Sequence, residues 1–166
     1  MSRRTRNELI ETLLAALRNG GTHSMLFHAL VAERLGLYAT DHKCLDFLLR
    51  EGPITAGRLS ELTGLTTGAI TGIVDRLEQA GFVARQRDEQ DRRKVIVQPD
   101  IRRIESEIGP LFASLARAAR GLFSSYSDNE LAVIHDFVMR SQRMMQEESA
   151  KLRAIPVRKR QAAGGR

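Results

Sequence analysis

The stretch LTTGAITGIVDRLEQAG, residues 65–81, has the pattern of a helix that begins with small polar residues and ends at a glycine. Ile70, Ile73, Val74 and Leu77 recur at helical spacing and give this helix one apolar face. Its front half is rich in threonine and glycine, which a free-standing helix disfavours. These small residues are therefore expected to contact a partner rather than to stabilise the helix.

The residues before this stretch complete a helix-turn-helix pattern. Thr55 is a typical N-cap for a short helix through Leu62, and TGL at 63–65 supplies a turn that contains glycine. Thr66 or Thr67 can then cap the second helix. In such a motif the second helix lies in the DNA major groove, where its N-terminal residues contact base edges.

The second helix offers three features that suit DNA. Small side chains let its backbone approach the duplex, hydroxyls can reach phosphates or base edges, and a helix N-terminus attracts phosphate. An arginine further along is placed for a phosphate or a guanine. The expected DNA contacts are Thr66, Thr67, Gly68, Ala69, Thr71, Gly72 and Arg76. The alternative is that threonine and glycine simply cap and crowd a buried helix.

Two strand-like runs follow, FVARQR at 82–87 and KVIVQP at 94–99, joined by the charged hexapeptide DEQDRR. This pattern predicts a β-hairpin. An arginine on a thin loop can enter a narrow minor groove, where the potential is most negative. The expected contacts of this wing are Arg87, Asp91, Arg92, Arg93 and Lys94, with Asp91 orienting a neighbouring arginine rather than facing DNA. A solvated charged turn is the alternative.

Helices are also predicted on both sides of this region. Apolar residues at helical spacing predict one helix that stops at NGG, residues 19–21, and a second that ends at Gly36. A third helix is expected behind Thr40 as its N-cap. After the hairpin, the helical pattern is interrupted at Pro110 and resumes behind a capping box at Ser127.

Composition limits the class of protein. The chain has 166 residues, enough for one domain with additional helices, and it has no apolar run of the roughly 18 residues that a membrane helix needs. No signal-peptide pattern follows the N-terminal arginines, so a cytoplasmic location is expected. The net charge of +6 is accounted for by six basic residues from Lys151 onward, where no acidic residue occurs. Global charge is therefore a weak argument for DNA binding.

Residues 59–97, LSELTGLTTGAITGIVDRLEQAGFVARQRDEQDRRKVIV, resemble the winged helix-turn-helix of MarR-type transcription regulators. VDRLEQAGFVAR and the wing DEQDRR are the matching motifs. The resemblance implies a homodimer whose terminal helices interlock, with recognition helices in successive major grooves and wing arginines in minor grooves. It assigns the aspartate and arginine pair of the wing to Asp91 and to Arg92 or Arg93. It also implies a ligand or an oxidant that alters DNA affinity.

The resulting fold class is mainly α with a small β-hairpin wing. N-terminal dimerisation helices are expected at 1–36, the winged helix-turn-helix at 37–99 and C-terminal dimerisation helices at 100–152, with a basic flexible tail at 153–166. The expected partners are a second copy of the chain and double-stranded DNA with a palindromic operator, and no membrane. The tail either adds sequence-independent DNA affinity or only solubilises the chain.

A cleft for a small organic ligand is expected from apolar walls with a few polar groups, lined by Met25, Phe27, His28, Leu30 and Tyr38. The same residues also suit a plain dimer core. Cys44 lies on an apolar helix face, which disfavours redox sensing. A zinc site would combine Cys44 or a carboxylate with some of the histidines at 23, 28, 42 and 135, but His23 and His28 lack the i, i+4 spacing of metal ligands. Lone histidines are more often ordinary surface or hydrogen-bonding groups, so neither a metal nor a cofactor is expected.

The function expected from the sequence is a dimeric repressor that a small molecule releases from its operator. A winged helix used for protein contacts, without an operator, is one alternative, and a redox- or metal-sensing regulator is another. An enzyme is disfavoured because the chain lacks a phosphate-binding glycine loop, a GxSxG elbow, HExxH and CxxC.

Overall fold

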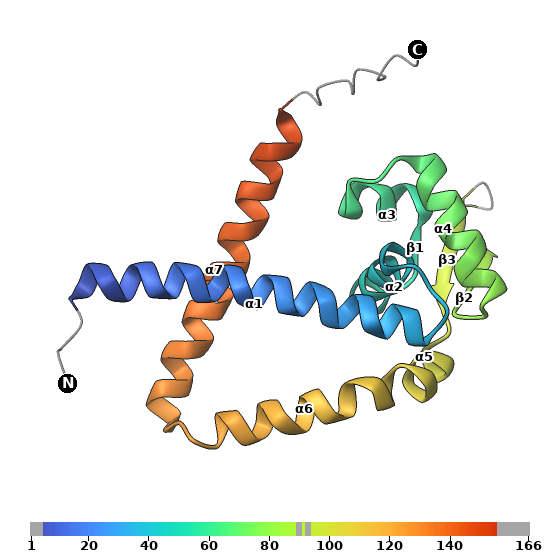
Figure 1. Ribbon diagram of the computed structural model, residues 1–166. Coiled ribbons are helices and arrows are strands. Elements are labelled where there is room, and N and C mark those ends of the chain that lie inside the picture. The colour runs from blue at the N-terminus through green and yellow to red at the C-terminus, as the bar shows by residue number, and fades with distance from the viewer. Residues whose placement is uncertain (1–4, 89–90, 92–93, 156–166) are drawn as a thin grey trace, which may run out of the picture. The chain divides into compact units, whose positions relative to one another are not determined.

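The computed structural model describes residues 5–88, 91 and 94–155, and the chain divides into two compact units after Ala113. Its elements in chain order are α1 (Arg6–Arg34), α2 (Ala39–Glu51), β1 (Ile54–Thr55), α3 (Ala56–Thr63), α4 (Thr67–Gln79), β2 (Val83–Arg87), β3 (Val95–Pro99), α5 (Ile101–Glu107), α6 (Gly109–Phe123) and α7 (Asp128–Ala154) (Figure 1). Within the described ranges, no helix combines the length and apolar character needed to cross a membrane.

The first unit begins with one long helix where the sequence predicted two. α1 starts at a capping box between Thr5 and Glu8 and continues to Arg34, so the predicted stop at NGG is wrong. A glycine that ends a helix adopts a positive φ, as Gly36 does at 67°, whereas Gly20 and Gly21 do not. Glycine also adopts helical dihedrals, at a cost of about 1 kcal/mol relative to alanine. Gly20 and Gly21 therefore weaken α1 without ending it.

The helix-turn-helix forms as its caps predict. The Thr55 hydroxyl accepts a hydrogen bond from the Arg58 N–H at 3.1 Å and begins α3. Gly64 ends α3 with a φ of 73°, and the Thr66 hydroxyl then accepts from the Ala69 N–H at 3.3 Å to begin α4. Because each of these signals is satisfied locally, the two helices and their turn follow from the sequence.

Helix α2 begins earlier than predicted. Its N-cap is Tyr38, whose extended backbone precedes Ala39, so the assignment of Thr40 as N-cap is wrong. Thr40 already lies inside the first turn, and its hydroxyl contacts the carboxylate of Asp41 at 3.4 Å instead of capping the helix. This start places Asp41 in the first turn, where it is fully buried.

The core of the first unit joins α2, α3 and α4 to the sheet. Ile70, Ile73, Val74 and Leu77 are at most 3% exposed, which confirms the predicted apolar face of α4. They pack in one cluster with side chains from the neighbouring elements, which include Leu45, Leu48, Leu59, Phe82 and Val97. This packing leaves only the opposite side of α4 available for a partner.

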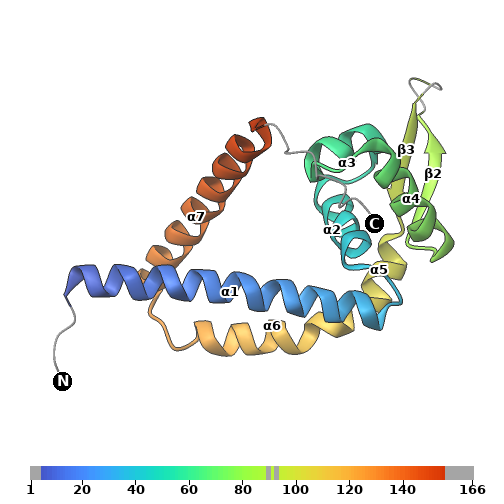
Figure 2. The same ribbon diagram turned by 45° about the horizontal axis from the view of Figure 1, so that its top comes forward.

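The predicted hairpin is formed by β2 and β3, with Val83 paired to Pro99 and Arg87 to Val95. β1 pairs with the other edge of β3 and completes a three-stranded sheet in the order β1-β3-β2. The sequence did not predict β1, because two residues carry too little alternation to be recognised. Both views show the hairpin beside α4 (Figures 1 and 2).

The helices after the sheet are divided as expected. α5 ends at Glu107 and α6 begins at Gly109, which places Pro110 in the first turn of α6. Proline is tolerated there because first-turn N–H groups have no partner within the helix. α7 begins at the predicted capping box, in which the Ser127 and Glu130 side chains bond to each other's backbone N–H.

Candidate nucleic-acid interface

The front half of α4 presents an exposed strip of small and polar residues. Thr66, Thr67, Gly68, Ala69 and Thr71 are exposed, while Gly72 and Arg76 are half-buried. The Thr71 hydroxyl donates to the Thr67 carbonyl at 3.0 Å. The seven residues predicted to contact DNA thus all reach the surface, on the side of α4 that the core leaves uncovered.

An open groove of about 370 Å³ runs along this strip. Its lining residues are Thr40, Leu65, Gly68, Ala69, Gly72, Ile73 and Arg76. A Cβ placed on Gly68 would meet no atom within 4 Å, so the helix backbone is unobstructed there. The groove therefore allows close approach to the α4 backbone from outside.

Arg76 is held by a buried carboxylate. Its Nε donates to Asp41 Oδ2 at 2.7 Å and its Nη2 donates to Oδ1 at 2.6 Å. The guanidinium also lies 5.1 Å from the centre of the Tyr38 ring. Two of its donor groups are thus engaged within the protein, and a contact between Arg76 and DNA stays a prediction.

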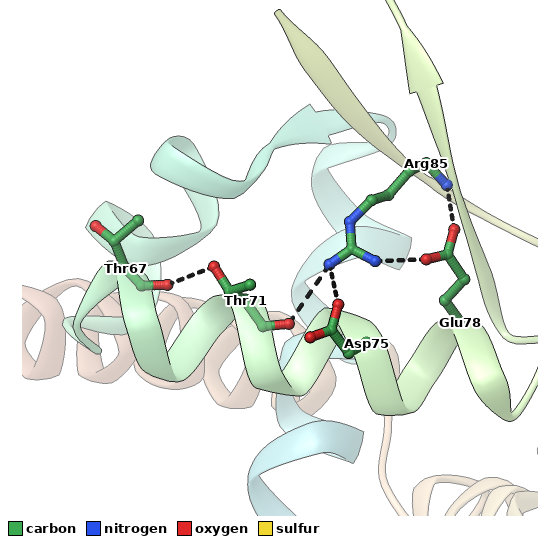
Figure 3. A network of polar contacts seen from close by, with 5 residues as sticks. All are labelled: Thr67, Thr71, Asp75, Glu78 and Arg85. Atoms are coloured by element: carbon green, nitrogen blue, oxygen red, sulfur yellow. Dashed lines mark hydrogen bonds and ion pairs between the residues drawn. The ribbon is translucent and has the colours of Figure 1, made fainter.

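A second arginine, Arg85 of β2, contacts the exposed side of α4 (Figure 3). Its Nη1 donates to Glu78, its Nη2 donates to Asp75 Oδ1 at 2.5 Å, and its backbone N–H donates to Glu78 Oε1 at 2.9 Å. The backbone hydrogen bond from Arg85 lowers the pKa of Glu78, so this carboxylate is ionised at neutral pH. Arg85 therefore pairs with two carboxylates of α4 and offsets part of their negative charge.

Sequence reasoning did not assign this role to Arg85. A signal was present, because Asp75 and Glu78 are three residues apart and share one face of α4. Which cation would face them depends on the strand that packs beside α4, and the sequence alone did not show that pairing. The guanidinium also reaches the Thr71 carbonyl at 3.5 Å, which joins this network to the exposed strip.

The wing is described in part. Arg87 and Lys94 are exposed and Asp91 is half-buried, while Arg92 and Arg93 lie outside the described residues. Asp91 Oδ2 lies 3.9 Å from Lys94 Nζ. The proposed pairing of Asp91 with a neighbouring arginine and the placement of the two arginines in a minor groove stay predictions.

A cavity of about 230 Å³ lies elsewhere in the first unit, lined by His42, Leu45, Asp46, Leu49, Ile108 and Phe112. Phe27 and His28, two of the predicted pocket residues, pack against Phe112 with ring centres 5.3 and 5.6 Å away. Met25, Leu30 and Tyr38 are 60–67% exposed and do not line this cavity. None of the five predicted pocket residues is among those that line this cavity, so the predicted ligand cleft stays a prediction.

His42 is one of the cavity residues that the sequence did not assign to a ligand pocket. Its ring lies 5.4 Å from that of His28, and the Nδ1 atoms of both are buried without a hydrogen-bond partner in the described part of the chain. Burial, and then the neighbouring His28, lower the pKa of His42, which is therefore neutral at pH 7. Neutral imidazoles can donate to or accept from a ligand.

The structure also bears on redox sensing by Cys44 and on the alternative of a metal site. Cys44 is 1% exposed, and burial raises the pKa of its thiol to about 11. The reactive thiolate is accordingly scarce at neutral pH, which argues against redox sensing at this residue. Among the residues with described positions, no group of three or more His, Cys, Asp or Glu could hold a metal ion.

Known proteins resemble the chain in sequence. Residues 37–95 match the MarR family model. The chain is 41% identical over 152 residues to the uncharacterized HTH-type transcriptional regulator YcgE of Bacillus subtilis (strain 168), covering 92% of this chain and 98% of that protein. YsmB, another uncharacterized HTH-type transcriptional regulator of that strain, is 29% identical over 106 residues, covering 63% of this chain and 70% of YsmB.

Solved structures resemble it in fold. A MarR family protein from Bacillus stearothermophilus aligns with a TM-score of 0.67 at 24% identity, covering 86% of this chain and 99% of that one. The transcriptional regulator Tm0710 from Thermotoga maritima aligns with a TM-score of 0.60 at 22% identity, covering 84% of this chain and 98% of that one. These likenesses confirm the predicted winged helix-turn-helix fold.

Proposed function

The chain belongs to the MarR family of transcription regulators, and from that premise we propose that it is a homodimeric repressor of a palindromic operator. A small organic ligand releases it from that operator. The single observation that carries the proposal is the exposed strip of small and polar residues on α4, opposite the apolar face that the core buries.

Charge on α4 supports a DNA contact. Asp75 and Glu78 would repel phosphate, but Arg85 pairs with both of them. Threonine hydroxyls and the helix N-terminus are then the groups that the front half of α4 offers to a duplex. On the wing, Arg87 and Lys94 are exposed cations, and Arg92 and Arg93 add two more in the sequence.

Exposed apolar side chains support a homodimer. In α1, Leu9, Ile10, Leu13, Leu14 and Leu17 are 41–51% exposed. In α7 the exposed apolar residues include Val133, Phe137, Val138, Met144 and Met145. Contiguous apolar surface of this kind marks an interface with another protein. A symmetric dimer would present two copies of α4, which suits an inverted repeat with half-sites about one helical turn apart.

The cavity beside His42 supports a ligand. Its walls are mainly apolar, and the buried Nδ1 atoms of His28 and His42 supply polar atoms near it. A small organic molecule with an apolar body and a polar group fits this chemistry. Release from the operator requires that the ligand bind the DNA-incompetent conformation more tightly than the DNA-bound one.

Selection of binding sites from a random duplex pool tests the proposal. The full-length protein is mixed with the pool at near-physiological salt, in the presence of non-specific competitor. An enriched inverted repeat is the expected result. Absence of any enriched sequence from a folded protein would count against operator binding and favour a winged helix that contacts another protein.

A further inference from the structure

Asp41 of α2 and Arg76 of α4 form an ion pair although they are 35 residues apart in the sequence. Asp41 lies in the first turn of α2 and has no exposed surface. Arg76 lies on α4, directly behind the exposed strip, and its side chain is 41% exposed. The pair therefore links the buried start of α2 to the helix that is proposed to enter DNA.

The guanidinium of Arg76 is fixed on several sides. Both oxygens of Asp41 accept from it, and the ring of Tyr38 lies against it. Its remaining nitrogen, Nη1, is 3.6 Å from the place where a Cβ would stand on Gly72. A two-point hydrogen bond between planar groups fixes orientation as well as distance, which a single contact does not.

Arg76 cannot turn toward DNA without leaving a buried carboxylate unpaired. A buried charge that loses its partner is strongly unfavourable, more so than the loss of an exposed ion pair. A contact that turns Nε and Nη2 toward a base or phosphate would therefore compete with Asp41. Support of the helix, rather than direct contact, is the role consistent with this geometry.

We propose that Arg76 is a positioning residue, which together with Asp41 sets how the front half of α4 is presented to DNA and does not itself contact the duplex. This inference rests on the proposed DNA-binding function. It assigns a role to Asp41, which sequence reasoning did not include among the site residues. It also makes the affinity for DNA depend on α2. The residue after Asp41 in this helix, His42, lines the cavity.

Asp41→Asn separates positioning from charge. The substitution keeps the shape of the side chain and removes one negative charge, so electrostatics alone predicts equal or tighter DNA binding. A positioning role predicts the opposite result. The full-length Asp41→Asn protein should bind the selected duplex about tenfold more weakly than wild type does, as when supporting residues of a site are removed. Arg76→Gln is expected to weaken binding similarly, and the two effects should not add in the double variant.

The salt dependence distinguishes the two roles of Arg76. If Arg76 contacts a phosphate, Arg76→Gln lowers the slope of log affinity against log salt by about one. Positioning predicts an unchanged slope. Arg50→Gln is the matched control, because Arg50 is an exposed cation at the other end of α2 that pairs with Asp46. The inference would be overturned if Arg76→Gln reduced the slope, or if the Asp41→Asn protein bound DNA as tightly as wild type.

Hydrogen exchange tests the positioning without DNA. In the full-length protein, Asp41→Asn should increase amide exchange in residues 67–76 more than Arg50→Gln does, while exchange in β2 and β3 changes little. Equal exchange in the two variants would overturn the inference even if no operator had been found. If the wild-type protein selects no duplex but the exchange result holds, the proposed function fails and the positioning of α4 by Asp41 stands.

Discussion

His42 binds a proton less readily in the folded chain than in the unfolded chain. Burial and the neighbouring His28 lower its pKa from the ordinary value of 6.5, while Asp46 opposes the shift and Lys43 adds to it. Between pH 6.5 and the lowered pKa of folded His42, the unfolded chain therefore holds a proton that folded His42 does not. By linkage, the free energy of unfolding then falls as the pH falls through this window.

We expect His42→Gln to reduce this pH dependence between pH 7 and pH 5. A single proton contributes at most about 1.4 kcal/mol per pH unit to the slope, so the change is measurable by urea unfolding at a fixed protomer concentration. His23→Gln is the control, because His23 is exposed on α1. Equal slopes for wild type and His42→Gln would show that His42 is not protonated differently in the two states.

Single residues also show where sequence reasoning reached its limit. The strip from Thr66 to Gly72 was predicted because its signal is local: small residues at the start of a helix whose other face is apolar. Asp41, His42 and Arg85 were not predicted as site residues, because each acts through a neighbour brought close by the fold. A charged or polar side chain on a predicted helix or strand does not reveal whether it is buried.

At the scale of elements, α4 is tied to its neighbours by two arginines. Arg76 connects α4 to α2, while the adjacent Asp75 connects it to β2 through Arg85. Consecutive side chains on α4 thus bond to different elements. This arrangement fixes the helix on both sides and leaves its front half exposed.

Arg85→Gln is expected to weaken DNA binding, because Asp75 and Glu78 would then stand near phosphates without their cation. Since these groups are partly exposed, the effect should be on the order of 1 kcal/mol and should diminish at high salt. Fluorescence anisotropy with the selected duplex at several salt concentrations measures it. Asp75→Asn in the Arg85→Gln background should restore part of the affinity, and the absence of both effects would contradict this role.

Elements differ in how well the sequence predicts them. α3, α4 and the hairpin were predicted because caps, turns and apolar spacing agree within a few residues. The stop at NGG was wrong because glycine permits both a helix and its end, and only the sign of φ at Gly20 and Gly21 decides. β1 was missed because its pairing with β3 joins residues more than 40 positions apart.

At the scale of the whole molecule, exposed apolar side chains on α1 indicate that this helix is incomplete without a partner. On one face of α1 lie Leu9, Ile10, Leu13, Leu14 and Leu17, while Ala15 lies opposite the centre of that face. A second copy of the chain is the partner that the proposed function requires. Dimerisation would bury the apolar row and fix the separation of the two α4 helices.

Leu14→Glu should weaken the homodimer. Burying a leucine contributes about 1.5–3 kcal/mol, and a two-fold interface contains the position twice, so the dissociation constant should rise by at least about a hundredfold. Analytical ultracentrifugation over a range of concentrations measures this change. Ala15→Glu is the matched control on the opposite face, and equal dimer dissociation for the two variants would contradict an interface at Leu14.

Methylation interference on the selected duplex is the most direct test of the claim that two α4 helices read DNA in successive major grooves. Methyl groups on guanine N7 lie in the major groove, so they should block binding of the full-length protein at two clusters about 10 base pairs apart. The predicted result is two such clusters placed symmetrically about the centre of the inverted repeat. A single cluster, or no interference in the major groove, would contradict the account.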